Sequence, residues 1–213
     1  VIWVYQKQIA ANQHFLDQWY QAVNKAYKAA GHSDDIFMVG EAWDGNHSNP
    51  EQYYYKGLPS NFEFDYGYLV RDMFNSASKA SSFASTVSGY VSDHLVQRSD
   101  AITSLFLSNH DQNRFANDLG RSVAKEKQAG AILLSGPAKP FIYQGEELGY
   151  WGTKDNGDEY VRTPILWDKA GSDCAKKGVN GKVDSSMLKA DISVEAQKAT
   201  DGSIRKVYQD WSR

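Results

Sequence analysis

Two short apolar segments of the sequence each lead directly into residues that could do acid–base chemistry. Residues 36–39 are apolar and precede Glu41, and the mostly apolar residues 104–108 precede Asn-His-Asp at 109–111. Such runs are typical of strands buried in a parallel sheet. Parallel strands present their carboxyl ends on one rim, so we expect Glu41 and Asp111 on the same rim, where two carboxylates can divide the roles of proton donor and charge stabiliser.

Each motif also has a plainer interpretation when it is taken alone. A single Glu after a strand is more often a solvated loop residue, and Asn-His-Asp is more often a turn with side-chain caps. Their joint occurrence at two strand ends favours a site.

The elements that must position these residues alternate between strand and helix. Apolar residues recur at spacings of three and four between Asn12 and Ala30, which predicts an amphipathic helix that Gly31 can end. The same reading predicts strands at 36–41, 61–66, 104–108 and 139–143, helices at 69–74, 83–97 and 123–135, a loop-rich stretch at 145–191, and a helical segment from 192 onward. This alternation argues for parallel βαβ units.

The composition is that of an ordinary globular protein. The chain has 213 residues, 41% of them hydrophobic and 13% aromatic, with a net charge of −3, so nucleic acid is not expected as a partner. It contains no apolar run of about 18 residues, so no membrane partner is expected. The single cysteine, Cys174, predicts neither an internal disulfide nor a zinc site. The localisation is open, because any signal peptide would lie outside this chain.

Four segments in order resemble motifs of the α-amylase family of glycoside hydrolases: residues 39–43, 106–111, 139–149 and 161–167. The resemblance implies an α/β fold that is part of a (β/α)₈ TIM barrel, with about strands five to eight and their helices. A complete barrel usually needs about 250 residues. We therefore expect residues 1–213 to form a single partial catalytic barrel domain, with the N-terminal half and the C-terminal β-domain lying outside it.

The resemblance also implies roles for individual residues. Glu41 corresponds to the general acid/base, and Asp111 to a third carboxylate that stabilises the oxocarbenium-like transition state. His110 and Trp43 are expected to bind substrate, as is Arg114. For Arg114 two alternatives are open: an ion pair with a carboxylate that orients the site, or a surface cation.

The nucleophile that the family carries is missing from its expected place. The family has a Gly-Phe-Arg-x-Asp pattern at the end of strand four, whereas residues 1–9 contain neither Arg nor Asp, and the first acidic residue is Asp17. We therefore expect a glycoside hydrolase of α-1,4-glucans with a retaining mechanism, present here as a fragment that is inactive alone. The alternatives are a non-catalytic barrel relative that serves in binding or assembly, and an exo-acting α-glucosidase.

No cofactor or metal site is evident in the sequence. The acidic stretch 155–159 lacks the spacing of a calcium loop, and the resemblance allows calcium only in the complete enzyme. The expected partners are an α-glucan substrate and either a second copy or a complementary N-terminal half, because half a barrel leaves two strand edges unpaired.

Overall fold

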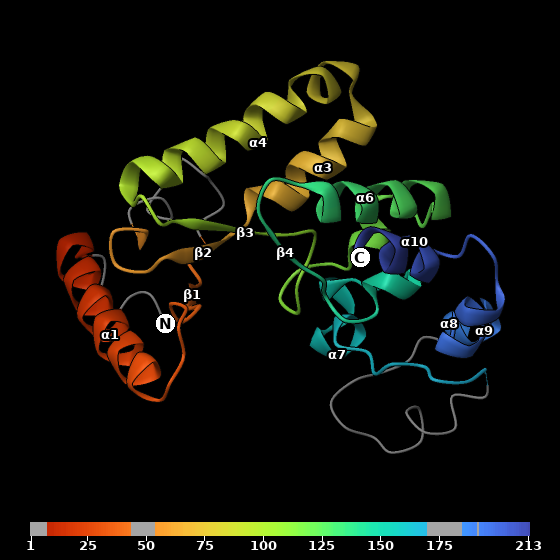
Figure 1. The fold of residues 1–213 in the computed structure, drawn as a ribbon. Coiled ribbons are helices and arrows are strands. Elements are labelled where there is room, and N and C mark those ends of the chain that lie inside the picture. The colour runs from red at the N-terminus through yellow and green to blue at the C-terminus, as the bar shows by residue number, and fades with distance from the viewer. Residues whose placement is uncertain (1–7, 44–53, 170–184, 191) are drawn as a thin grey trace. The chain divides into compact units, whose positions relative to one another are not determined.

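The computed structural model describes residues 8–43, 54–169, 185–190 and 192–213 (Figure 1). These residues belong to two compact units. The first unit comprises residues 1–69, 78–105 and 137–139, and the second comprises residues 70–77, 106–136 and 140–213. Each unit is described by itself.

The first unit is built on a parallel sheet. Strand β1 (Val39–Gly40) pairs with β2 (Ser60–Glu63), which pairs with β3 (Ile102–Phe106), and both pairings are parallel. The strand order is β1-β2-β3-β4, with β4 at Lys139–Phe141. Strand order therefore follows chain order, as expected for successive βαβ units, and the prediction of an α/β partial barrel is confirmed.

Helix α1 (Ile9–Ala29) packs its apolar face against the segment that leads into β1. Leu16 and Tyr20 of this helix share a core cluster with Ala42, and Ile36 and Met38 pack on its edge. The apolar run at 36–39 was expected to be strand throughout, but only its last residue belongs to β1. Its earlier side chains contribute packing instead of ladder hydrogen bonds.

A buried polar group lies between β2, β3 and helix α4 (Ala77–Gln97). The Nε2 atom of His94 lies 3.5 Å from a carboxylate oxygen of Glu63, and its Nδ1 atom lies 2.7 Å from the Thr103 hydroxyl. The ring of Tyr55 stacks on His94 with centroids 3.9 Å apart. These contacts fix α4 to the sheet, because buried polar groups are costly unless they have partners.

The second unit is mainly helical, and helix α3 (Asp65–Asn75) runs into it from the first. Its elements are α5 (Phe115–Asp118), α6 (Val123–Ser135), η1 (Glu146–Leu148), η2 (Lys154–Asn156), α7 (Asp158–Val161), α8 (Ser185–Ala190), α9 (Val194–Ala199) and α10 (Ile204–Trp211). Helices α9 and α10 begin at Ser193 and Ser203, whose hydroxyls accept backbone N–H groups of the first turn. Among the described residues, no helix is both long enough and apolar enough to cross a membrane.

The chain turns sharply after β4. Gly145 has a φ of +87°, and a Cβ atom there would come within 2.5 Å of the Tyr150 ring. Glycine is therefore needed at this position both for its left-handed backbone and for the close approach of the ring.

Candidate active site

Asp111 lies in the turn that follows β3. Its backbone N–H donates to the Asn109 side-chain oxygen at 2.9 Å, so the predicted Asn-His-Asp motif is indeed a turn with a side-chain cap. One carboxylate oxygen of Asp111 lies 3.4 Å from Nε2 of His110. The Asp111 side chain is 34% exposed, which leaves it open to a ligand.

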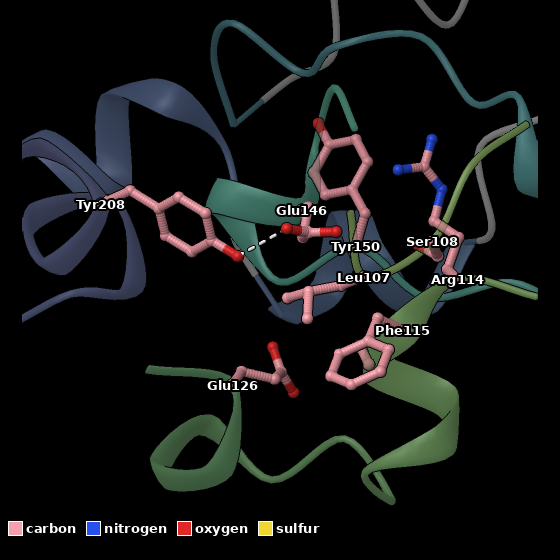
Figure 2. Close-up of a pocket in the computed structure, with 9 residues that line it drawn as sticks. Leu107, Ser108, Arg114, Phe115, Glu126, Glu146, Tyr150 and Tyr208 are labelled. Carbon is pink, nitrogen blue, oxygen red and sulfur yellow. Dashed lines mark hydrogen bonds between the residues drawn. The ribbon is translucent and has the colours of Figure 1, made fainter. Parts of the chain in front are cut away.

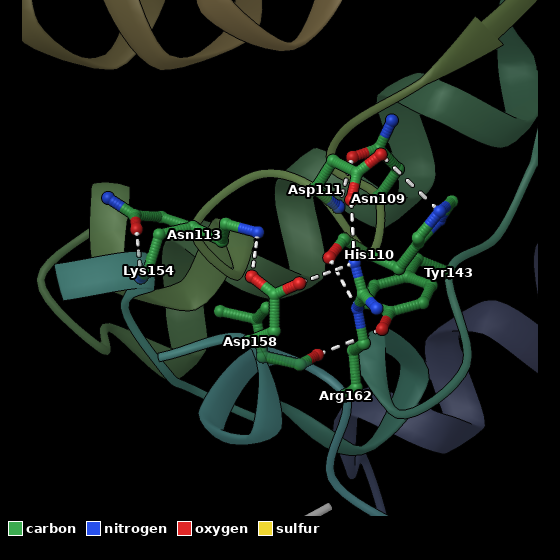
Figure 3. Close-up of polar contacts among 9 residues, drawn as sticks. Asn109, His110, Asp111, Asn113, Tyr143, Lys154, Asp158 and Arg162 are labelled. Atoms are coloured by element: carbon green, nitrogen blue, oxygen red, sulfur yellow. Dashed lines mark hydrogen bonds and ion pairs between the residues drawn. The ribbon is translucent and has the colours of Figure 1, made fainter. Parts of the chain in front are cut away.

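Arg162 holds the other side of this turn (Figure 3). Its Nη2 atom donates to Asp111 Oδ1 at 2.8 Å, and its Nε atom donates to the His110 carbonyl at 3.1 Å. The same Nη2 atom lies 2.8 Å from Asp158. One guanidinium thus contacts both the backbone and the carboxylate of the motif, so it fixes the direction in which Asp111 points.

Asp158 forms ion pairs with both Arg162 and Lys154. Lys154 forms an ion pair with Asp158, and this hydrogen bond is the main reason that the pKa of Asp158 lies below its usual range. The backbone N–H of Lys154 donates to the Asn113 side-chain oxygen at 2.8 Å, which ties the loop after β3 to the segment around α7 (Figure 3).

Arg114 takes a position that differs from both alternatives. It is only 1% exposed, so it is not a surface cation, and no carboxylate of the described residues forms an ion pair with it. Its guanidinium donates to the Gln144 carbonyl at 2.6 Å and to the Thr163 hydroxyl at 3.1 Å, and lies over the rings of Tyr143 and Tyr150. Burial lowers the pKa of Arg114. Arg114 is buried and joins the loops after β3 and β4, and its expected role in substrate binding stays a prediction.

Glu41 and Trp43 lie in the first unit, directly after β1. Glu41 is exposed, Ala42 is buried in the core cluster, and Trp43 is 47% exposed. The Trp43 ring stacks on buried Phe64 with centroids 5.1 Å apart and planes 7° apart. The indole is therefore held in place on one side, and a flat aromatic surface of this kind can cover the apolar face of a sugar ring.

The structure brings the predicted residues together in two groups. His110 and Asp111 contact each other in the second unit, and Glu41 and Trp43 lie two residues apart in the sequence of the first. Arg162 was not predicted as a site residue, although it belongs to the 161–167 motif, which was the available signal. Residues 1–7, where the nucleophile motif was sought, lie outside the described part of the chain.

The acidic stretch 155–159 contributes Asp158 to the ion pairs around Arg162. Within the ranges that the structure describes, no three His, Cys, Asp or Glu side chains are grouped so that they could hold a metal ion. Asp158 is instead paired with Lys154 and Arg162. Cys174 lies outside these ranges.

Comparison with known proteins agrees with the motifs. Residues 4–213 match the model of the α-amylase catalytic domain. The chain is 40% identical over 202 residues to α-amylase SusG of Bacteroides thetaiotaomicron, and 37% identical over 152 residues to α-amylase 3 of Dictyoglomus thermophilum. These matches cover 95% and 70% of this chain, respectively.

Solved structures show the same fold. Amy13B of Eubacterium rectale superimposes with a TM-score of 0.78 at 25% identity over 99% of this chain, and an α-amylase from H. orenii with a TM-score of 0.73 over 96%. The chain spans 41% and 39% of those two structures, and 28% of the Bacteroides relative. The chain belongs to the α-amylase family of glycoside hydrolases.

Proposed function

We propose that this chain is the part of an α-amylase catalytic barrel that supplies the general acid/base and a transition-state-stabilising carboxylate for retaining hydrolysis of α-1,4-glucans. Glu41 is the acid/base, and Asp111 is the stabilising carboxylate. His110 and Trp43 contact the sugar. The proposed substrate class follows from the relatives, which are named α-amylases.

The observation that carries this proposal is the arrangement around Asp111. A carboxylate that stabilises an oxocarbenium-like transition state must be ionised, fixed and accessible. The Arg162 guanidinium lies 2.8 Å from Asp111, the turn is capped by Asn109, and the carboxylate stays one-third exposed. An ion pair this exposed contributes little to stability, so its orienting effect on Asp111 is the better explanation of the arrangement.

The nucleophile must come from outside this chain. A retaining glycosidase needs a second carboxylate about 5 Å from the acid/base. Residues 1–9 contain no Asp or Glu, and the first acidic residue, Asp17, lies on α1, where it pairs with Arg98 at 3.7 Å. We therefore expect the 213-residue polypeptide alone to release no reducing ends from starch above background.

A hybrid enzyme tests the assignment. This chain replaces the matching segment of the Bacteroides thetaiotaomicron α-amylase, whose remaining residues complete the barrel, and starch hydrolysis is followed by reducing-end release. Glu41→Gln and Asp111→Asn should each lower the rate by at least about a hundredfold, since a general acid/base is typically worth 10² to 10⁴. Asp34→Asn, an exposed carboxylate before β1, is the matched control.

Two outcomes would contradict the proposal. A loss of less than about tenfold in either variant would remove that residue from the chemistry. Turnover by the 213-residue polypeptide alone, abolished in Glu41→Gln, would place the nucleophile within this chain.

Release of the α-anomer, followed by NMR, is the expected result for a retaining mechanism in the hybrid enzyme.

A further inference from the structure

Three elements of the second unit meet at the side chain of Tyr208. The ring of this residue, on α10, packs directly on Gly130 of α6, where an added Cβ atom would come within 2.4 Å of it. Its hydroxyl donates to Glu146 of η1 at 2.7 Å (Figure 2). Tyr208 therefore joins the last described helix to both α6 and the loop after β4.

Two carboxyl groups line the small cavity beside this contact. Glu146 and Glu126 surround a space of about 10 Å³, room for about one water molecule, together with Arg114, Ser108 and Tyr208. Figure 2 shows both carboxyl groups directed toward this space. The second oxygen of Glu146 has no hydrogen-bond partner among the described residues. Ser108 directly precedes the Asn-His-Asp motif, so the cavity also adjoins the loop that carries Asp111.

Neither carboxyl group has a cation that would hold it ionised. No Lys or Arg of the described residues forms an ion pair with Glu146 or Glu126, and the guanidinium of Arg114 is engaged with Gln144 and Thr163. Burying an unpaired carboxylate is costly, so such groups bind a proton instead.

Burial raises the pKa of Glu146 to about 8 and that of Glu126 to about 7. The Tyr208 hydroxyl and Arg114 oppose the shift of Glu146, while Glu147 on η1 and Glu126 on α6 add to it. The other charged group facing this cluster from α10 is Arg205, which acts on Glu147. Burial is the largest cause for both Glu146 and Glu126, so both are protonated in mildly acidic solution.

Protons can reach the cluster through Glu126. This residue also lines an open cavity of about 230 Å³ between α6, η1, α9 and α10. Glu126 therefore lies between the larger cavity and the small one that Glu146 lines.

We propose that Glu146, Glu126 and Tyr208 form a proton-dependent latch that holds α10 against α6 and η1 while both carboxyls are protonated. Ionisation releases α10, because the cost of burying the two charges exceeds what the Tyr208 hydrogen bond gains when Glu146 becomes a carboxylate. Each carboxyl has a folded-state pKa above its ordinary value of 4.5, so its contribution is complete below pH 4.5. This contribution to the stability of the folded state is lost as the pH rises above 4.5 and passes the folded-state pKa, about 7 for Glu126 and about 8 for Glu146.

Hydrogen exchange of the α10 backbone amides tests the latch in the protein as expressed. After correction for intrinsic exchange rates, the opening constant of α10 should rise at least about tenfold between pH 5 and pH 8 in the wild type. Glu146→Gln keeps the shape and the acceptor for Tyr208 but cannot ionise, so most of this rise should disappear. Glu126→Gln should remove a smaller part.

Glu195→Gln is the control, because Glu195 is an exposed carboxylate on neighbouring α9 and should leave the pH dependence unchanged. Titration of the Glu carboxyl carbons by NMR in the unmodified protein provides a second measurement that needs no variant. Two carboxyls with midpoints near 7 and 8 are expected. Equal α10 protection at pH 5 and pH 8, a pH dependence that survives in both Gln variants, or midpoints all near 4.5 would overturn the proposal.

Discussion

Arg162 is the side chain whose contacts say most about how the candidate site is held. It lies 51 residues after Asp111 in the sequence, is 39% exposed, and binds both the carboxylate and the backbone of the motif. Exposed ion pairs contribute only about 0–1 kcal/mol to stability, so this pair is better explained by orientation than by folding.

We predict that Arg162→Gln separates activity from stability in the hybrid enzyme. Starch hydrolysis should fall by about tenfold or more, because a misdirected Asp111 no longer matches the transition state. The free energy of unfolding should change by less than about 1 kcal/mol. Activity and denaturant unfolding, measured on the same preparation, check both parts.

Lys28→Gln is the matched control. Lys28 lies on α1, and its Nζ atom forms an exposed ion pair with Asp35 at 2.7 Å, which the substitution removes. It should change neither activity nor, beyond about 1 kcal/mol, stability. Unchanged activity in Arg162→Gln would show that Asp111 is positioned by its own turn alone.

At this scale the sequence predicted which residues to examine better than it predicted their contacts. Glu41 and Asp111 were predicted as site residues because each lies within three residues of the end of an apolar run. The burial of Arg114 could not be foreseen, because a charged side chain is seldom fully buried unless paired. Two tyrosine rings, a carbonyl and a hydroxyl from distant segments surround it instead.

Among the elements, the contact between α6 and α10 depends on the absence of a side chain at Gly130. We predict that Gly130→Ala destabilises the protein by about 1–3 kcal/mol. The new methyl carbon would lie only 2.4 Å from Cε2 of the Tyr208 ring, which is closer than van der Waals contact allows. Thermal or denaturant unfolding measures this change.

Gly89→Ala on α4 is the corresponding control, because an added Cβ atom there would meet nothing within 4 Å. Alanine has the higher helix propensity, so this variant should stabilise the protein by about 0.5–1 kcal/mol. Stabilisation of similar size by both substitutions would mean that α10 does not pack on α6 as described.

Element boundaries were predictable where apolar periodicity is strong. The helix predicted at 123–135 has those bounds, whereas the helix predicted at 83–97 begins at Ala77. Its first turns are rich in Ser and Ala and carry no apolar stripe, and the hydroxyls of Ser81 and Ser82 bond to the Ser78 carbonyl. Periodicity cannot detect such a segment, because few of its side chains enter the core.

For the whole molecule, the partial-barrel fold was predictable because four motifs occur in the family's order, and three of them contain residues of a strand. The buried contacts between Glu146, Glu126 and Tyr208 were not, because they join residues up to 82 positions apart that carry no shared pattern. Sequence motifs thus marked the strand ends, while the packing of the later helices required coordinates.

The last prediction concerns assembly of the 213-residue polypeptide. In the described sheet, β1 and β4 stand at the two ends of the strand order, so each presents an edge of backbone N–H and C=O groups. Phe37, Ile102 and Ile142 are still 36–42% exposed. Burying the exposed part of these three side chains is worth about 2–3 kcal/mol in total, to which pairing of the strand edges would add. We therefore expect the polypeptide to self-associate or to bind a complementary half of the barrel. Sedimentation across a dilution series should show species larger than 23.9 kDa, and a monodisperse monomer that melts cooperatively would exclude this assembly.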